Sequence, residues 1–204
     1  MSKVIVSYKK KQNESFYLRS WIVRDVQELV AIHATYPAWP VIKKFVPPFK
    51  TTGSSVFNSQ NLQNARHFVK VTGFHKIDNY TVSGSVRDDC CHILVEFSPT
   101  CVADFERHHG IRITSQTVNT IFLIGDVTLK FVPVRELRAS GKWSLNFDVD
   151  SRVTAVPVLV INRCQAFDLD QVEARLRFPF LYQLESFIEK FRSRPGVIPM
   201  DEGC

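Results

Sequence analysis

Two clusters of residues have side chains that can bind a metal ion or transfer a proton. Cys90, Cys91 and His92 are consecutive, and His108 and His109 form a second pair. Zinc ligands are usually about two to four residues apart, so that one turn presents both to the ion, whereas adjacent residues of a strand point to opposite faces. The chain also contains no C-x-x-C spacing. The spacing therefore argues against zinc, and we expect no metal and no cofactor.

The motifs of nucleophilic and phosphoryl-transfer catalysis are missing from the sequence. There is no G-x-S-x-G turn, and the GKWS segment at 141–144 lacks the earlier glycine that a P-loop requires. Carboxylates are present at Asp88, Asp89 and Glu106, but no spacing among them identifies an acid–base pair. We therefore expect a protein that is not an enzyme.

Basic charge is concentrated near the N-terminus. Residues 1–50 hold 9 Lys/Arg and 3 Asp/Glu, whereas residues 51–204 hold 17 of each sign. A fold that binds nucleic acid along its own groove is expected to carry the positive excess itself, so this distribution weakens direct nucleic-acid binding. Single-strand binding through strand aromatics such as Phe68 and Phe97 stays an alternative, because such side chains can stack on bases.

Length and composition indicate one domain of ordinary size with terminal extensions. The chain has 204 residues, of which 45% are apolar, and this is enough to bury a core. No run of about 18 apolar residues predicts a membrane span, and the N-terminus lacks the order of charge and apolar residues typical of a signal peptide. Five cysteines, an odd number, without such a signal favour a reducing compartment.

The elements that position these residues are predicted from periodicity. Short β-branched and aromatic runs predict strands at residues 67–74, 80–86, 91–98, 120–134, 142–149 and 155–167. After the third run, Ser98 can cap a helix, Pro99 fits its first turn and Gly110 can end it. Three strands, a helix and further strands are the order of the OB fold, a five-stranded Greek-key barrel with a helix between strands 3 and 4. We therefore predict a mainly β protein of this class with flanking helices.

The segments on either side of the barrel are predicted to be helical or irregular. Helices are predicted at residues 15–33 and 168–192, the second broken by Pro179. The proline-rich segment 34–64 is predicted to be an irregular loop. The domain organisation expected from these patterns is an N-terminal strand, helix and loop packed on the barrel (1–65), the barrel with its C-terminal helix (66–182) and a partly disordered extension (183–204).

A series of motifs resembles a known family. SWI at 20–22 is followed by HFVKVTGF, SVRDDCCHILVEFS, FERHHGIRITSQTVN, IGD, PVLVIN and FDLDQV…FPFLY, in the order of the third ever-shorter-telomeres family. The resemblance covers roughly residues 1–30 and 66–182. Members are regulatory subunits of yeast telomerase, with an OB fold related to that of the shelterin component that recruits telomerase in vertebrates. The resemblance implies a nuclear, telomeric, non-catalytic docking module of a ribonucleoprotein that maintains telomeres.

The same resemblance implies partners and a docking surface. The expected partners are the N-terminal domain of the telomerase reverse transcriptase and the first ever-shorter-telomeres subunit. Telomerase RNA and telomeric DNA are expected nearby with at most weak direct binding, and no membrane is expected. The alternative is an OB-fold protein that binds single-stranded telomeric DNA or RNA. The implied partner-binding residues are Trp21, Asp88, Glu106, Arg112, Thr117 and Asn119, and the implied further surface residues are Lys70, Asp168 and Asp170.

Some of the implied contact residues also have a structural interpretation, which for Trp21 has equal weight. Trp21 can anchor a helix on the barrel, because tryptophan is buried on average. Asp88, or Asp89 in its place, can form a charge-assisted bond with Arg112 that fixes a turn. Such a bond would still matter for binding, and the sequence leaves both interpretations open.

The further surface residues have ordinary interpretations as well. Asp168 or Asp170 can cap the predicted helix that begins there. Lys70 can be an outward lysine of a strand. These three positions are therefore the least specific part of the predicted surface.

Overall fold

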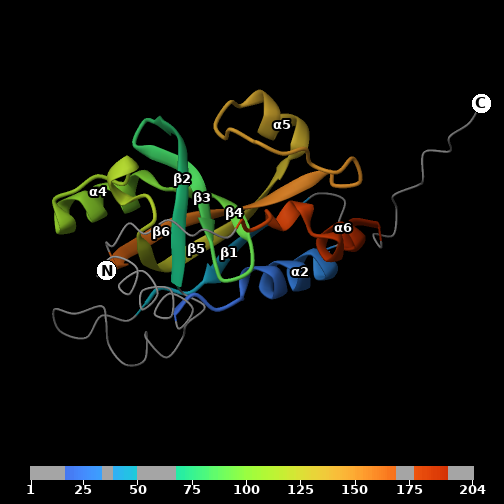
Figure 1. Cartoon of the computed structure of the whole chain (residues 1–204), viewed down its shortest axis with the longest axis horizontal. Coiled ribbons are helices and arrows are strands. Elements are labelled where there is room, and N and C mark those ends of the chain that lie inside the picture. Colours follow the sequence, from blue (N-terminus) through green and yellow to red (C-terminus); the bar gives the residue numbers. More distant parts are fainter. Residues whose placement is uncertain (1–16, 34–38, 50–67, 169–176, 193–204) are drawn as a thin grey trace, which may run out of the picture.

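A closed barrel of five β-strands lies at the centre of the molecule (Figure 1). The computed structural model describes residues 17–33, 39–49, 68–168 and 177–192. The barrel strands are β2 (Phe68–Asp78), β3 (Thr81–Arg87), β4 (His92–Phe97), β5 (Ile121–Pro133) and β6 (Ala155–Asp168). They pair in the order β2-β3-β4-β6-β5, and β5 pairs with β2 to close the barrel. The pair β4–β6 is parallel and the others are antiparallel. This is the OB-fold order, as predicted.

Helix α4 (Pro99–His109) lies between the third and fourth barrel strands. Ser98 Oγ accepts a hydrogen bond from the backbone N–H of Cys101 at 3.3 Å, and Pro99 occupies the first turn. Gly110 ends the helix at φ 66°, a left-handed conformation that glycine adopts without strain. Val102 and Phe105 are buried on one face of the helix. The predicted caps and boundaries of this helix are confirmed.

Two glycines allow neighbouring strands of the barrel to bend together. The register of β2 against β3 shifts on either side of Gly73 and Phe74, which marks the bulges. A Cβ on Gly84 would lie 2.6 Å from the carbonyl oxygen of Gly73, so β3 accepts no side chain at that point. The close approach of the two backbones explains why glycine occupies both positions.

Helices α2 (Ile22–Ile32) and α6 (Glu185–Arg192) lie side by side, away from α4 (Figure 1). In α2, Ile22, Val26 and Val30 are buried at helical spacing. In α6, Phe187 and Phe191 are buried. The two helices are linked at their exposed edge, where Gln27 Nε2 donates to Ser186 Oγ at 2.9 Å. The predicted N-terminal helix therefore exists, but it begins at Ile22 and not at Ser15, which lies outside the described residues.

The predicted helix at 168–192 is wrong over much of its length. β6 extends to Asp168, which pairs with Ile121 of β5. Residues 169–176, including Asp170, lie outside the described residues. Residues 177–180 are not helical, a short 3₁₀ turn follows at Leu181–Gln183, and α6 begins at Glu185. The long strand β5 provides hydrogen-bonding partners along the whole of β6, and these stabilise residues up to Asp168 as strand. A prediction from local sequence patterns does not include such distant partners.

Two further elements differ from the prediction. Within the segment predicted as loop 34–64, β1 (Val41–Val46) pairs with the outer part of β5. The predicted strand 142–149 is absent, and these residues form an irregular connection after α5 (Val134–Ala139). Their alternation reflects packing on the barrel, because Trp143 is buried and its Nε1 donates to the carbonyl of Val95 at 3.2 Å.

One apolar core joins the barrel to both flanking helices. It includes Trp21 and Ile22 at the start of α2, the inward residues of the barrel, and Phe187 and Phe191 of α6. The expected boundary after residue 182 therefore separates α6 from side chains on which it packs. Across the part of the chain that the structure describes, no helix is long and apolar enough to cross a bilayer.

Candidate protein-binding site

Asp88 is a buried carboxylate that fixes the start of α2. Its Oδ2 accepts hydrogen bonds from the backbone N–H groups of Trp21 and Ile22, both at 2.9 Å. Its Oδ1 accepts from Cys90 at 2.7 Å and from Cys91 at 3.0 Å. Trp21 occupies the N-cap position and provides no capping side chain, so Asp88 replaces the cap from 67 residues away in sequence. One side chain thus orders both the β3–β4 turn and the helix.

Trp21 is buried in the same region. Its side chain is 1% exposed, its Nε1 donates to the carbonyl of Phe68 at 3.3 Å, and its ring lies 6.1 Å from that of Phe45. These contacts hold the start of α2 against β2. The structure therefore places Trp21 as the packed helix anchor that the sequence left as one of two interpretations.

Arg112 does not meet Asp88. Arg112 is exposed and lies near Val82 at the start of β3. Asp88 directly follows Arg87, at the opposite end of that strand. The separation from Val82 to Arg87 corresponds to about 17 Å along a strand. The predicted Asp88–Arg112 bond is therefore wrong, and Asp89 cannot replace it because it lies at the same end as Asp88.

Arg112 and Glu106 instead line a hollow between the β2–β3 turn and α4, here named the hairpin groove. Its volume is about 370 Å³. The residues around it are Ile77, Asn79, Tyr80, Val82, Val102, Glu106, Arg112, Ile113 and Thr114. Tyr80 is 69% exposed and Ile77 is 57% exposed. Asn79 and Tyr80 form the two-residue hairpin turn at φ 47° and 61°, as this turn type requires.

The charged side chains of the hairpin groove have no bonding partner among the described residues. Within the described residues, the Glu106 carboxylate and the Arg112 guanidinium make no hydrogen bond or ion pair. The neighbouring charges of α4 behave differently, since Arg107 pairs with Asp104 at 3.0 Å. The groove therefore presents an acid and a base that remain available to a partner.

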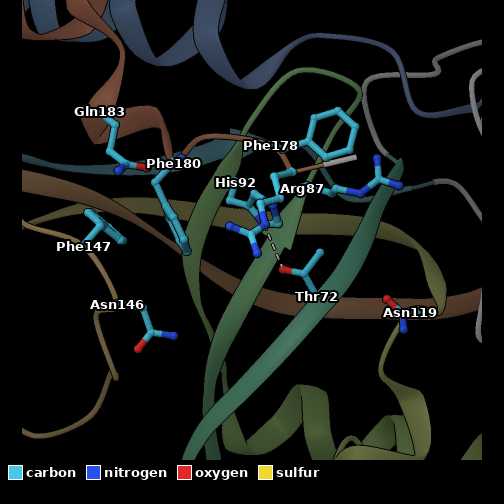
Figure 2. Close-up of a pocket in the computed structure, with 10 residues that line it drawn as sticks. Thr72, Arg87, His92, Asn119, Asn146, Phe147, Phe178, Phe180 and Gln183 are labelled. Atoms are coloured by element: carbon cyan, nitrogen blue, oxygen red, sulfur yellow. Dashed lines mark hydrogen bonds between the residues drawn. The ribbon is translucent and has the colours of Figure 1, made fainter. Parts of the chain in front are cut away.

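A second hollow, here named the aromatic pocket, lies farther along the barrel (Figure 2). Its volume is about 500 Å³. The residues around it are Thr72, Arg87, His92, Asn119, Asn146, Phe147, Arg177, Phe178, Phe180 and Gln183. The Phe180 ring stacks on His92 at 5.1 Å and on Phe147 at 4.4 Å. The backbone N–H of His92 donates to the carbonyl of Pro179 at 2.8 Å, so residues 177–183 are attached to the barrel here.

Most polar groups of the aromatic pocket already have partners. His92 Nδ1 lies 3.0 Å from Thr72 Oγ1, the bond dashed in Figure 2. Arg87 donates to the carbonyl of Asp88 at 3.0 Å and lies 4.5 Å over the Phe178 ring. Burial, followed by the charge of Arg87, lowers the pKa of His92 to about 4. The imidazole is therefore neutral at pH 7 and serves the packing of the pocket.

The remaining predicted surface residues are distributed unevenly. Asn119 is half-buried and lines the aromatic pocket, not the hairpin groove. Thr117 is fully buried, and its Oγ1 donates to the carbonyl of Thr114 at 3.0 Å. Lys70 is also fully buried, so the expectation of an outward lysine is wrong, because strand β2 is covered on both faces at this point. Asp168 is half-buried. The structure thus brings together Glu106 and Arg112 at the hairpin groove and Trp21 and Asp88 at the start of α2, and these two pairs lie apart.

Sequence reasoning missed Tyr80 and Ile77. The prediction placed Tyr80 in the strand 80–86, whereas the structure places it with Asn79 in the two-residue turn between β2 and β3, where side chains project outward. The paired histidines also separate, because His108 Nδ1 contacts the carbonyl of Asp104 at 2.6 Å and His109 Nε2 contacts Gln165 at 3.0 Å. In the described ranges, no three His, Cys, Asp or Glu side chains are grouped to hold a metal ion.

Comparison with known proteins gives consistent matches over most of the chain. The shelterin complex subunit family TPP1/ACD matches residues 18–183. The telomere replication protein EST3 of Candida glabrata is 37% identical over 171 residues, which are 83% of this chain and 92% of the relative. EST3 of Eremothecium gossypii is 32% identical over 193 residues, 93% of each chain. EST3 of Kluyveromyces lactis is 32% identical over 184 residues, 89% of this chain and 97% of the relative.

A solved structure supports the fold. The Est3 telomerase subunit in the yeast Hansenula polymorpha has a TM-score of 0.53 against this chain at 20% sequence identity, and the alignment covers 85% of this chain and 84% of that chain. At this identity the likeness concerns the fold alone. It agrees with the barrel order described above.

Proposed function

The chain belongs to the family of the shelterin subunit TPP1/ACD and the yeast telomere replication protein EST3, and on this premise we propose that it is a non-catalytic regulatory subunit of telomerase. It supports recruitment or activation of the enzyme and thereby the maintenance of telomeres. The observation that carries this conclusion is the 32–37% identity to EST3 proteins, which extends over 83–93% of the chain. The family match over residues 18–183 includes the whole barrel and α2.

Burial of the barrel aromatics supports protein docking over single-strand binding. Phe68, Phe97 and Phe122 are fully buried, and a buried ring cannot stack on a base. The exposed aromatic of the described barrel strands and turns is Tyr80, which lies beside the carboxylate of Glu106 in the hairpin groove. The groove also holds the guanidinium of Arg112, so its acid and base leave no net positive charge to attract a phosphate backbone.

The proposed partners are the N-terminal domain of the telomerase reverse transcriptase and the first ever-shorter-telomeres subunit, in a nuclear ribonucleoprotein at telomeres. Glu106, Arg112 and Asn119 are proposed to contact a partner directly, since they lie at surface hollows. Trp21, Asp88 and Thr117 are proposed to act indirectly. They are buried, and they position the helix and the turn on which the surface depends. Lys70 and Asp168 are assigned the same indirect role.

The test is complementation in yeast cells that lack their own copy of this subunit. We expect the full chain to maintain telomere length over successive generations and to co-precipitate telomerase RNA from the cell extract. A fluorescent fusion is expected at telomeric foci in the nucleus. The control is the same chain with Asp88→Ala, which is expected to weaken both readouts because its fold is destabilised.

Two outcomes would contradict the proposal. In the first, telomeres shorten although the folded chain is present at normal amount. In the second, the chain maintains telomeres but never precipitates telomerase RNA, and purified chain binds telomeric single strands tightly with a steep salt dependence. The second outcome would favour the single-strand-binding alternative.

A further inference from the structure

Exposed apolar side chains gather at one place on the described surface. The large apolar residues that are most exposed are Ile32, Val41, Ile77 and Tyr80. Ile32 and Val41 lie on α2 and β1, whereas Ile77 and Tyr80 lie together at the hairpin groove. The floor of the groove is continuous with the core, because Val82, Val102 and Ile113 are 0–3% exposed. An apolar hollow with exposed apolar walls is typical of a protein-binding site.

The exposed wall of the groove is held in place before any partner binds. Ile77 pairs with Val82 and Asp78 pairs with Thr81 in the β2–β3 ladder, directly before and after the turn. The two turn residues have the left-handed backbone of a tight hairpin. Tyrosine has few rotatable bonds, so fixing it against a partner loses little conformational entropy.

The charges around the groove select the kind of partner. Glu106 and Arg112 have opposite signs and no intramolecular ion pair within the described residues. An occupant that matches both must present a base and an acid on either side of an apolar side chain. This pattern suits an amphipathic helix, in which residues about three to four positions apart share one face. β3 is hydrogen-bonded on both edges, to β2 and to β4, so the strand in the floor offers no edge for an added strand.

We propose that the hairpin groove binds an amphipathic helix of a partner protein, with Tyr80 as its main apolar contact and with Glu106 and Arg112 pairing with a basic and an acidic residue of that helix. The identity of the partner as a telomerase protein rests on the proposed function. The groove itself rests on the exposure, volume and charges of these residues.

The test compares variants of the full chain in cells, with co-precipitated telomerase RNA as the readout. Tyr80→Ala and Tyr80→Asn both remove the ring, and asparagine suits the left-handed backbone at this position, so the second variant preserves the turn. Each is expected to reduce co-precipitation about tenfold, as for a central interface residue. Glu106→Lys combined with Arg112→Glu reverses both charges and is expected to do the same. The matched control is Ile32→Ala, which removes a side chain of 62% exposure outside the groove.

A photo-crosslinking amino acid at position 80 identifies the occupant, with position 32 as the control. We expect a crosslink from position 80 to a protein segment with apolar residues three or four positions apart, flanked by both charge signs. A crosslink to nucleic acid, or to a segment with no helical apolar pattern, would overturn the groove proposal. So would undiminished co-precipitation by all the groove variants while the unmodified chain associates. If the unmodified chain does not associate with telomerase, both the proposed function and the telomerase partner of the groove are contradicted. If only the groove variants lose association, both the proposed function and the groove proposal are supported.

Discussion

The hairpin groove and the aromatic pocket are hollows of about 370 and 500 Å³ on the same barrel. They differ in the state of their polar groups. In the aromatic pocket, Arg87 donates to the carbonyl of Asp88 and His92 bonds to Thr72 of β2, and the stacked rings attach residues 177–183 to the barrel. In the hairpin groove, Glu106 and Arg112 bond to nothing within the described residues. The larger hollow is therefore mainly a packed junction of the fold, with Asn119 as its one proposed contact residue, whereas the smaller hollow has charged groups left for a partner.

The comparison shows that volume alone does not identify a binding site. A polar group that already has an internal partner must break that hydrogen bond before it can bind another molecule. The free energy lost with the first bond then nearly cancels the free energy gained with the second. A group that only water solvates can form a new bond at lower cost when an apolar contact is buried beside it. The following predictions test the distinction between a structural and a binding region.

The largest effect is expected at Asp88, beside the aromatic pocket. Asp88→Ala leaves four backbone N–H groups without an acceptor, and we expect the free energy of unfolding to fall by about 3–5 kcal/mol. Urea denaturation measures the loss. Asp89→Ala is the control, because Asp89 is exposed and should change stability by less than about 0.5 kcal/mol. If Asp88→Ala keeps full stability but loses telomerase, Asp88 is a contact residue and the comparison fails.

Removing one aromatic ring from the aromatic pocket and one from the hairpin groove tests directly which of the two regions is structural. Phe180→Ala removes stacking on His92 and Phe147, and we expect a loss of about 2 kcal/mol in the free energy of unfolding because the ring is half-buried. Tyr80→Ala is expected to change stability by less than about 0.5 kcal/mol and to weaken telomerase association. Equal stability losses in the two variants would remove the distinction.

The pH dependence of stability is expected to report the aromatic pocket. The pKa of His92 is lowered from 6.5 to about 4, mainly by burial and then by the charge of Arg87. As the pH falls from 6.5 to 4, the unfolded chain binds a proton that the folded imidazole does not, so the free energy of unfolding falls. The expected contribution is about 2 kcal/mol, because part of the ring remains exposed. Above pH 6.5 the imidazole contributes no pH dependence.

His92→Gln tests this assignment by denaturation at several pH values. The variant removes the titrating group and should have a shallower dependence on pH between 4 and 6.5. The wild-type chain, denatured under the same conditions, is the reference for the slope. An identical slope in the wild-type chain and in His92→Gln would show that other groups control the acid response.

The smallest effect is expected at the charges of the hairpin groove. Glu106→Gln and Arg112→Gln should each change the free energy of unfolding by less than about 0.5 kcal/mol, and the double-mutant cycle should give a coupling near zero. Glu96 and Lys130, which pair at 2.6 Å, provide the comparison cycle. A measurable coupling between Glu106 and Arg112 would mean that they pair with each other in solution and are less available to a partner.

Local chemistry explains which elements could be predicted. Helix α4 was predicted with its boundaries because Ser98, Pro99 and Gly110 act within one turn of their own positions. β1, the full length of β6 and the irregular connection at 142–149 could not be predicted, because each depends on contacts with residues far along the chain. Strand pairing of this kind responds to context more than to propensity.

The residues of the candidate site were also predicted in part, with their local positions clear from the sequence and their burial not. The sequence indicated Glu106 and Arg112 as surface residues, and the structure adds that they share a hollow with Tyr80 and Ile77. Trp21 and Asp88 had two interpretations, and their burial decides for a structural position. Tyr80 lacked any signal beyond the turn, since the exposure of an aromatic side chain follows from the packing around it.

The sequence by itself established the barrel order, the capped helix and the family, because strand patterns, caps and collinear motifs are properties of residues close together in the chain. Tertiary structure alone resolved which side chains are accessible. It placed Asp88 under the start of α2, 67 residues away in sequence, buried Lys70 on strand β2 and joined the β2–β3 turn to α4 across the groove. The accessibility of a side chain depends on which distant segments of the chain cover it. Sequence periodicity does not show which segments these are.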